Sequence, residues 1–141
     1  QMINALTNST VPHLTVIIGS SYGAGTYAMS GRGYENRFTF LWPMAKIAVM
    51  GPKQIAGVMS LVRRGQAARK GLDFDEEGDA EIVRQVEAAQ EKGSLALEAT
   101  GTVSDDGIID PRDTRTVLGM ALSVVRTRPI EGTDGYGVFR L

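Results

Sequence analysis

The chain has 141 residues, the usual length of a single domain. Its 15 basic and 16 acidic residues give a net charge of −1, so a broadly basic nucleic-acid-binding surface is not expected. It has no cysteine and one histidine, His13, which excludes disulfides, thiol nucleophiles and zinc sites built from cysteines or several histidines. No apolar run reaches the roughly 18 to 20 residues of a membrane-spanning helix.

The first residues have the spacing of a helix interior. Met2, Ile3 and Leu6 recur at helical intervals, and the pattern ends before Pro12 because a residue preceding proline disfavours the helical region. A chain that begins inside a helix is expected to be the later part of a longer polypeptide. A natural start that lacks its methionine is the alternative.

Three short apolar runs predict strands at residues 14–18, 38–42 and 46–50. The first is β-branched throughout its centre and is expected to be buried and central. Pro43 ends the second run and Gly51 the third. Strands therefore lead, and the helical patterns that follow them indicate an α/β or α+β protein.

The later part of the chain predicts helices. Pro52 suits the first position of a helix reaching about residue 70, and Asp79 is expected to cap the next helix, which Gly93 ends. A short helix is expected at residues 94–99. The acidic run at residues 73–81 fits a solvated loop and helix start, or a contact with a basic partner.

A last helix is expected after Asp110. This aspartate is predicted to be its cap and Pro111 its first residue, and Pro129 stops it after an apolar stripe at residues 117–125. The glycine-rich end, residues 130–141, closes with three apolar side chains. We expect it to dock on a surface of the protein.

The glycine-rich segment at residues 19–29 follows a strand and is expected to open a helix. Such a turn points backbone N–H groups outward at the positive end of a helix. Gly23, Ala24 and Gly25 have almost no side chain, so a ligand oxygen can approach closely. A phosphate cradle, an oxyanion hole and a purely structural turn all fit this pattern. The phosphate-loop motif and the GxGxxG motif are absent from it. A serine nucleophile is not favoured, because the one histidine, His13, lies before the strand that leads into the turn.

The remaining polar residues have simpler explanations. His13 is expected at the start of a strand with no chemical role. Arg32 and Arg37 flank Tyr34 and would suit an anion, although surface pairing explains them as well. Turn and capping roles account for three aspartates that would otherwise suggest a metal site: Asp105, Asp106 and Asp110.

Several segments carry a more specific pattern when they are taken together in order. They are YGAG at 22–25, MxGRxY at 29–34, RF at 37–38, WPxAxIxVMG at 42–51, DDGIIDPxDTR at 105–115 and YGVFRL at 136–141. In this order they resemble the carboxyltransferase β subunits of biotin-dependent acyl-CoA carboxylases, and among these the methylcrotonyl-CoA and geranyl-CoA branch. The resemblance covers essentially the whole chain.

The resemblance implies an α/β, crotonase-like (ClpP/crotonase) carboxyltransferase C-terminal domain that is incomplete at its N-terminus, with residues 1–141 as its later part. It also implies a function, the transfer of a carboxyl group from carboxybiotin to an acyl-CoA. By resemblance the backbone amides of Ala24 and Gly25 are catalytic and hold the negative ureido oxygen of biotin. Tyr22, Gly23, Ala24 and Gly25 are then the biotin-binding residues, and no metal is required. Valine at position 25 is expected to crowd this turn.

The family also implies partners. Biotin is carried on a partner α subunit that contains the biotin carboxylase and the biotin carrier, and other β subunits form a homo-oligomer. The substrate is an acyl-CoA, and neither nucleic acid nor a membrane is involved. The expected location is the bacterial cytoplasm, or the mitochondrial matrix in a eukaryote. The isolated chain is expected to be inactive and to associate through apolar faces that lack their partners.

Some positions depart from the family pattern. Ser30 stands where a cysteine is common, Thr26 where an asparagine is frequent, and Pro52-Lys53 where Gly-Glu is usual. These differences leave the identity of the acyl group open.

Three alternatives to an acyl-CoA carboxylase remain. They are a biotin-dependent decarboxylase, a crotonase-like hydratase or isomerase, and a non-catalytic assembly fragment. The hydratase or isomerase would need a glutamate at the turn, and the nearest one, Glu35, lies outside it.

Overall fold

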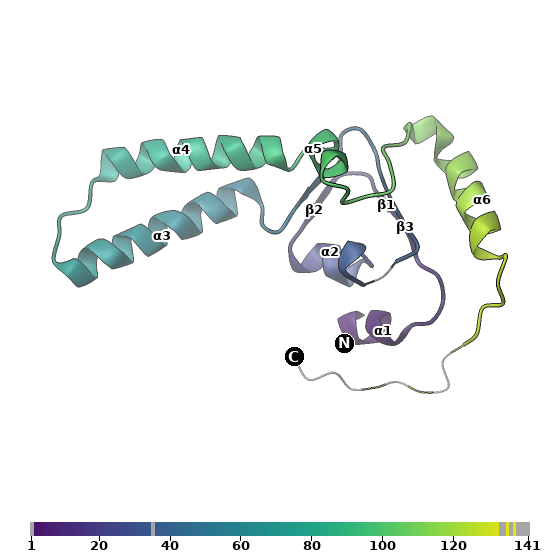
Figure 1. Ribbon diagram of the computed structural model, residues 1–141. Coiled ribbons are helices and arrows are strands. Elements are labelled where there is room, and N and C mark those ends of the chain that lie inside the picture. The colour runs from purple at the N-terminus through teal and green to yellow at the C-terminus, as the bar shows by residue number, and fades with distance from the viewer. Residues whose placement is uncertain (1, 35, 133–134, 136, 138–141) are drawn as a thin grey trace.

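The computed structural model describes residues 2–34, 36–132, 135 and 137. It consists of a small α/β body with a long helical hairpin projecting from one side (Figure 1). The helices are α1 (Met2–Asn8), α2 (Ala24–Ala28), α3 (Pro52–Lys70), α4 (Glu76–Gly93), α5 (Ala96–Gly101) and α6 (Thr114–Val125), with 3-10 turns at Arg32–Tyr34 and Pro111–Asp113. The strands are β1 (Leu14–Ile17), β2 (Ser20–Tyr22), β3 (Phe38–Leu41) and β4 (Lys46–Ala48).

The strands form two parallel pairs. β1 pairs with β3, with Val16 opposite Phe40, and β2 pairs with β4, with Ser21 opposite Ile47. The three predicted strands are present, but each ends at least one residue earlier than expected, and β2 was not predicted at all. Val49, expected in the last of them, is 81% exposed beyond β4.

The first strand is less buried than its β-branched sequence suggests. Only Ile17 is buried, the rest of β1 is half-buried, and Ile18 is 57% exposed beyond its end. The reason is that β1 has one strand neighbour in the described part of the chain, which leaves its other edge open. The expectation of a buried, central strand was therefore wrong for all but one residue.

Two small clusters form the core. Ile17 and Leu41 pack with three alanines of the β3–β4 loop and α5, namely Ala45, Ala96 and Ala99. The small alanine side chains let α5 approach closely enough for the Ala96 N–H to donate to the Ala45 carbonyl at 3.0 Å. The second cluster joins β3 to α6 and consists of Phe40, Ile109 and Ala121. These contacts hold α5 and α6 on opposite sides of the strands (Figure 1).

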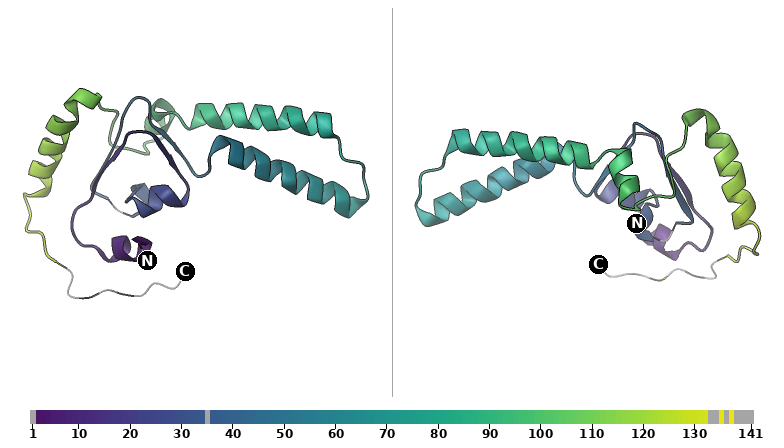
Figure 2. Two further views of the ribbon diagram at one scale, coloured as in Figure 1. Left: turned by 180° about the vertical axis from the view of Figure 1, so that it is seen from behind. Right: turned by 45° about the horizontal axis from the view of Figure 1, so that its top comes forward.

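Helices α3 and α4 run side by side as an antiparallel hairpin (Figures 1 and 2). Gly71 ends α3 in the left-handed conformation, with φ of 64°. Asp75 caps α4 by accepting the Gly78 N–H at 2.9 Å. The prediction that Asp79 is the cap was wrong, because Asp79 lies inside the first turn and faces α3. The end of α4 at Gly93 was predicted, while α5 begins two residues later than the short helix expected there.

Asp79 ties the two helices of the hairpin together. Its carboxylate is buried, lies 2.7 Å from the Arg63 guanidinium and accepts a hydrogen bond from the Ser60 hydroxyl. The Asp79–Arg63 contact has the distance of an ion pair without the alignment of a hydrogen bond. We therefore expect it to contribute less than a fully buried, well-aligned pair.

Arg63→Ala is expected to lower the free energy of unfolding by about 2 kcal/mol, because it leaves a buried carboxylate without its countercharge. Urea denaturation of the chain measures this change. The control is Arg84→Ala, which removes an exposed pair with Glu81 and should change stability far less. Equal losses from the two substitutions would show that burial of Asp79 is not important.

The described end of the chain docks on the α1 region (Figure 1). The side-chain amide of Asn8 donates to the Gly137 carbonyl at 3.1 Å, and the Gly137 N–H donates back to Asn8 Oδ1 at 2.7 Å. The Thr10 hydroxyl donates to the Glu131 carbonyl at 2.6 Å. The docking expected for residues 130–141 is therefore observed where the structure describes them. The apolar residues Val138, Phe139 and Leu141 lie outside the described residues.

Large apolar side chains remain exposed on several elements. They include Ile18, Val49, Leu97, Met120, Leu122 and Val124, which are 49 to 81% exposed. Such a surface promotes association, so we expect the isolated chain to be oligomeric or aggregated in light scattering. A monodisperse monomer with a cooperative melt would contradict this.

Among the described residues, no helix has both the length and the apolar character needed to cross a membrane.

Candidate functional site

The glycine-rich segment forms a strand–turn–helix junction. β2 ends at Tyr22, Gly23 is the N-cap, and α2 begins at Ala24. Gly23 has φ of 55° and ψ of −133°, a conformation that residues with a side chain rarely adopt. Its N–H donates to the Ala48 carbonyl of β4 at 3.1 Å, and its carbonyl accepts from the Thr26 N–H at 3.1 Å. The predicted helix is thus present, although β2 separates it from the first strand.

Ala24 and Gly25 are the first two residues of α2, and both are exposed. The first N–H groups of a helix have no acceptor within it. In the described part of the chain, no carbonyl or side chain accepts from these two amides. A Cβ added at Gly25 would have no atom within 4 Å. Two backbone donors therefore stand beside open space at a helix start.

The neighbouring residues hold α2 in place. Ser21 and Thr26 share a hydrogen bond of 2.9 Å between their hydroxyls, which joins β2 to the helix. The Gly31 N–H donates to the Thr26 carbonyl at 2.8 Å. Tyr27 packs edge-on against Tyr34, with 5.8 Å between ring centroids. The two exposed amides are therefore carried by a helix that is fixed at both ends.

His13 links the start of β1 to the residues after α2. Its Nδ1 lies 2.9 Å from the Ser30 hydroxyl, and its Nε2 lies 3.2 Å from the Ser9 hydroxyl. Ser30 is buried and has a positive φ of 59°. The Thr15 hydroxyl also donates to the Ser30 carbonyl at 2.8 Å. His13 and Ser30 therefore hold α2 against β1.

Two clefts flank α2. One, of about 440 Å³, lies between Gly23, Tyr27 and Val49 on one side and the residues that end α5 on the other. The second, of about 410 Å³, lies along β1 and includes Ser21 and Met29. Ala24 and Gly25 line neither cleft, and both are exposed at the surface. The half-buried Tyr22 ring lies beside Gly51 at the start of α3.

The aspartates considered as metal ligands have other roles. Asp105 accepts from the Gly107 N–H at 2.7 Å and from the Thr100 hydroxyl at 2.9 Å. Asp106 accepts from the Thr39 N–H at 2.7 Å and pairs with Arg32 at 2.9 Å. Within the described ranges, no three histidine or acidic side chains are grouped to hold a metal ion. The pairing of Arg32 with Asp106 agrees with the surface-pairing explanation of this arginine.

Asp110 caps the 3-10 turn before α6, and Asp113 takes the cap position of α6 itself. The Asp110 carboxylate accepts from the Arg112 backbone N–H at 2.8 Å and from its guanidinium at 2.7 and 3.0 Å. The hydrogen bonds from Arg112 hold the pKa of Asp110 below its ordinary value of 3.8. The guanidinium makes the larger contribution and the backbone N–H the smaller one. Asp110 is therefore a cap as predicted, but it begins the 3-10 turn at Pro111–Asp113 and not the helix α6 itself.

Asp110→Asn is expected to lower the melting temperature slightly at pH 7. The neutral asparagine side chain cannot form the ion pair with the Arg112 guanidinium. Its amide oxygen can still accept a hydrogen bond from the Arg112 backbone N–H. A carboxyl with a lowered folded-state pKa stabilises the protein above its unfolded pKa and loses this contribution as the pH falls through the folded value. The difference between the two proteins should therefore be full at pH 7, well above the ordinary pKa of 3.8, and smaller at about pH 2. Melting curves at both pH values test this, and a difference that does not change with pH would contradict it.

Comparison with known proteins identifies relatives of the whole chain. Residues 1–134 match the family model described as the carboxyl transferase domain. The chain is 55% identical over 140 residues to a probable biotin-dependent acyl-coenzyme A carboxylase beta2 subunit of Mycobacterium tuberculosis, covering 99% of this chain and 26% of the relative. It is 43% identical over 141 residues to the biotin-dependent 3-methylcrotonyl-coenzyme A carboxylase beta1 subunit of the same organism, covering 100% and 26%.

A solved structure has the same fold. The β subunit of geranyl-CoA carboxylase from P. aeruginosa superposes with a TM-score of 0.80 at 38% identity, over 99% of this chain and 26% of that subunit. The chain thus spans about a quarter of the length of the proteins that it matches.

Proposed function

Because the chain belongs to the carboxyl transferase domain family, we propose that it supplies part of the carboxyltransferase of a biotin-dependent acyl-CoA carboxylase. The fold is α/β and crotonase-like, as in carboxyltransferase β subunits. We assign residues 1–141 to the later part of the C-terminal domain of such a subunit. The observation that carries the proposal is the pair of exposed, unpartnered amides at Ala24 and Gly25, in a chain 43 to 55% identical to biotin-dependent β subunits.

The junction fits biotin in two respects. Two adjacent N–H groups without acceptors suit one oxygen that gains negative charge. The absence of any atom within 4 Å of an added Cβ at Gly25 leaves room for a ring to approach. When bound, biotin carries the carboxyl group, and its ureido oxygen becomes negative once that group leaves.

The chain's own contribution is then electrostatic. Ala24 and Gly25 donate their N–H groups to the ureido oxygen, and the positive end of α2 adds to this stabilisation. Gly23 sets the direction of both amides through its positive φ, and Tyr22 completes the biotin-binding residues of the turn. Fixed donors of this kind need no reorganisation during the reaction, and removing one costs on the order of 100-fold in rate.

The partners and the substrate follow from the relatives. We infer that biotin arrives on a separate α subunit that carries the biotin carboxylase and the biotin carrier, and that β subunits assemble as a homo-oligomer. The relatives named for methylcrotonyl-CoA and geranyl-CoA make these branched, unsaturated acyl-CoA esters the first substrates to test. The bacterial relatives favour the cytoplasm of a bacterium as the location.

The experiment uses the assembled enzyme. Labelled bicarbonate should be incorporated into methylcrotonyl-CoA or geranyl-CoA only with ATP, and avidin should block the reaction by binding biotin. A biotin-dependent decarboxylase would instead release carbon dioxide from a carboxylated acyl-CoA without ATP. Hydration or isomerisation of the acyl-CoA without biotin would contradict the proposal.

A further inference from the structure

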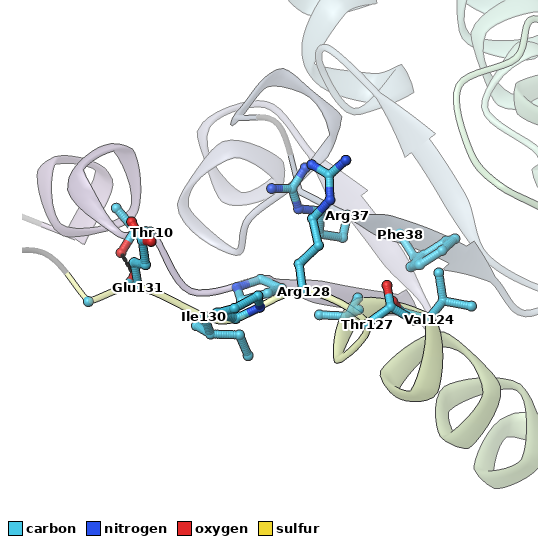
Figure 3. A pocket seen from close by; sticks show the side chains of 12 residues that line it. Thr10, Arg37, Phe38, Val124, Thr127, Arg128, Ile130 and Glu131 are labelled. Atoms are coloured by element: carbon cyan, nitrogen blue, oxygen red, sulfur yellow. Dashed lines mark hydrogen bonds between the residues drawn. The ribbon is translucent and has the colours of Figure 1, made fainter.

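A cleft of about 520 Å³ lies between the end of α6 and the segments beside β1 and β3 (Figure 3). One wall is formed by residues 124–125 and 127–132. The other is formed by Thr10, Pro12, Arg37 and Phe38. Most of the lining is apolar, and two arginines, Arg37 and Arg128, supply its positive charge. This cleft lies apart from Ala24 and Gly25.

Arg37 and Arg128 differ from other arginines of the chain in their pairing. Neither forms an ion pair with a carboxylate in the part of the chain that the structure describes, whereas Arg32, Arg63 and Arg112 each have one. Figure 3 shows both side chains directed toward the same side of the cleft. Two like charges that share a partly enclosed space repel each other, and a bound anion removes this repulsion.

Among the described residues, Glu131 is the one acidic residue that lines this cleft, and it forms no ion pair with either arginine. It lies beside Thr10 at the other end of the cleft in Figure 3, where the Thr10 hydroxyl donates to its main-chain carbonyl. The arginine end of the cleft is therefore positive, while the far end is not.

We propose that this cleft binds the phosphate group of a phosphorylated small molecule between Arg37 and Arg128. Guanidinium groups match the geometry of phosphate oxygens with two parallel hydrogen bonds. A phosphate monoester carries close to two negative charges at neutral pH, which balances two arginines, whereas a carboxylate carries only one. The proposal goes beyond carboxyl transfer and does not depend on it.

The adjoining space has room for the rest of such a molecule. A second cleft, of about 490 Å³, shares Thr10, Pro12 and Arg37 with the first. Its remaining lining is largely polar and includes Ser9 and His13. Arg37 thus stands where the two clefts meet, so a phosphate held there can carry a hydroxyl-bearing group on its polar side.

The backbone is hydrogen-bonded at Arg37 and at the residue before Arg128. The Arg37 N–H donates to the His13 carbonyl at 2.9 Å, and the Thr127 N–H before Arg128 donates to the Val124 carbonyl at 3.2 Å. Both side chains are exposed. Replacing either one with glutamine should therefore remove charge without unfolding the chain.

The test is calorimetric titration of the assembled enzyme, without acyl-CoA, with inorganic phosphate at low salt. We expect binding in the millimolar range, weakened about 10-fold by R37Q or R128Q and lost in the double variant. R115Q on α6, also exposed, is the matched control and should bind phosphate like the unmodified chain. Acetate should bind at least about 10-fold more weakly than phosphate, because it carries a single charge.

Several results would overturn the proposal. They are the absence of phosphate binding by the unmodified chain, unchanged affinity in R37Q and R128Q, and equal affinity for acetate and phosphate. Circular dichroism of each variant shows whether its fold is intact. A variant that unfolds is replaced by the lysine substitution, which keeps the charge and should keep part of the affinity.

Discussion

Replacing Gly25 with valine is expected to lower the rate of carboxyl transfer by about 100-fold or more, without unfolding the protein. Apart from its chain neighbours and the backbone of its own helix, no atom lies within 4 Å of a Cβ added at Gly25, and Gly25 does not have a positive φ. The expectation from sequence, that valine would crowd the turn itself, was therefore wrong. Its methyl groups instead enter the open space beside the Ala24 and Gly25 amides, which we assign to the ureido oxygen.

Three measurements on the assembled enzyme separate the possible causes of such a loss. Carboxylation of biotin should be unchanged, because we place it on another subunit, and acyl-CoA affinity should change little. Only the overall transfer should fall. Gly57→Val is the matched control, since Gly57 is an exposed helical glycine that also has no atom within 4 Å of an added Cβ.

Two outcomes would change the assignment. Normal transfer by Gly25→Val would remove these amides from the mechanism. Loss of acyl-CoA binding with intact decarboxylation of carboxybiotin would show that the turn serves the acyl substrate instead.

Gly23→Ala is expected to destabilise the chain by about 2 to 3 kcal/mol, through backbone strain and a close contact. The φ of 55° and ψ of −133° at Gly23 are unfavourable for any residue with a Cβ, and that Cβ would lie 3.0 Å from the Val49 carbonyl oxygen. The strain is also expected to weaken the hydrogen bond from the Gly23 N–H to the Ala48 carbonyl, which lies at the end of the β2–β4 pair.

Urea denaturation of Gly23→Ala and Gly25→Ala tests this difference between two neighbouring glycines. Gly25 lies in a helix with free space around it, so alanine there should be neutral or stabilise by up to about 1 kcal/mol. The two substitutions should therefore act in opposite directions or differ by at least about 2 kcal/mol. Similar effects on stability would mean that Gly23 does not hold the junction.

Local patterns account for the elements that were predicted correctly. The β-branched and aromatic runs indicate β1, β3 and β4, and proline and glycine mark the limits of α3 and α4. β2 was not predicted, because Ser20-Ser21-Tyr22 has no apolar run and becomes a strand only by pairing with Lys46–Ala48. Hydrophobic periodicity also does not show how many neighbours a strand has, so it overestimated the burial of β1.

Tertiary contacts explain the errors at single residues. Asp75 and Asp79 are both suitable caps by sequence, and only the approach of Arg63 from α3 turns Asp79 away from that role. In the candidate site, the position of Ala24 and Gly25 at a helix start was predicted from the strand and the small residues. The strained glycine was not distinguished from its neighbour, because nothing in the sequence places the Val49 carbonyl beside Gly23.

The central claim is that the Ala24 and Gly25 amides bind the ureido oxygen of biotin, and a structure of the assembled enzyme with biotin tests it most directly. We predict that this oxygen lies about 2.7 to 3.2 Å from both backbone nitrogens, the range of N–H···O hydrogen bonds. A ureido oxygen that contacts other donors, with these two amides facing solvent, would contradict the account.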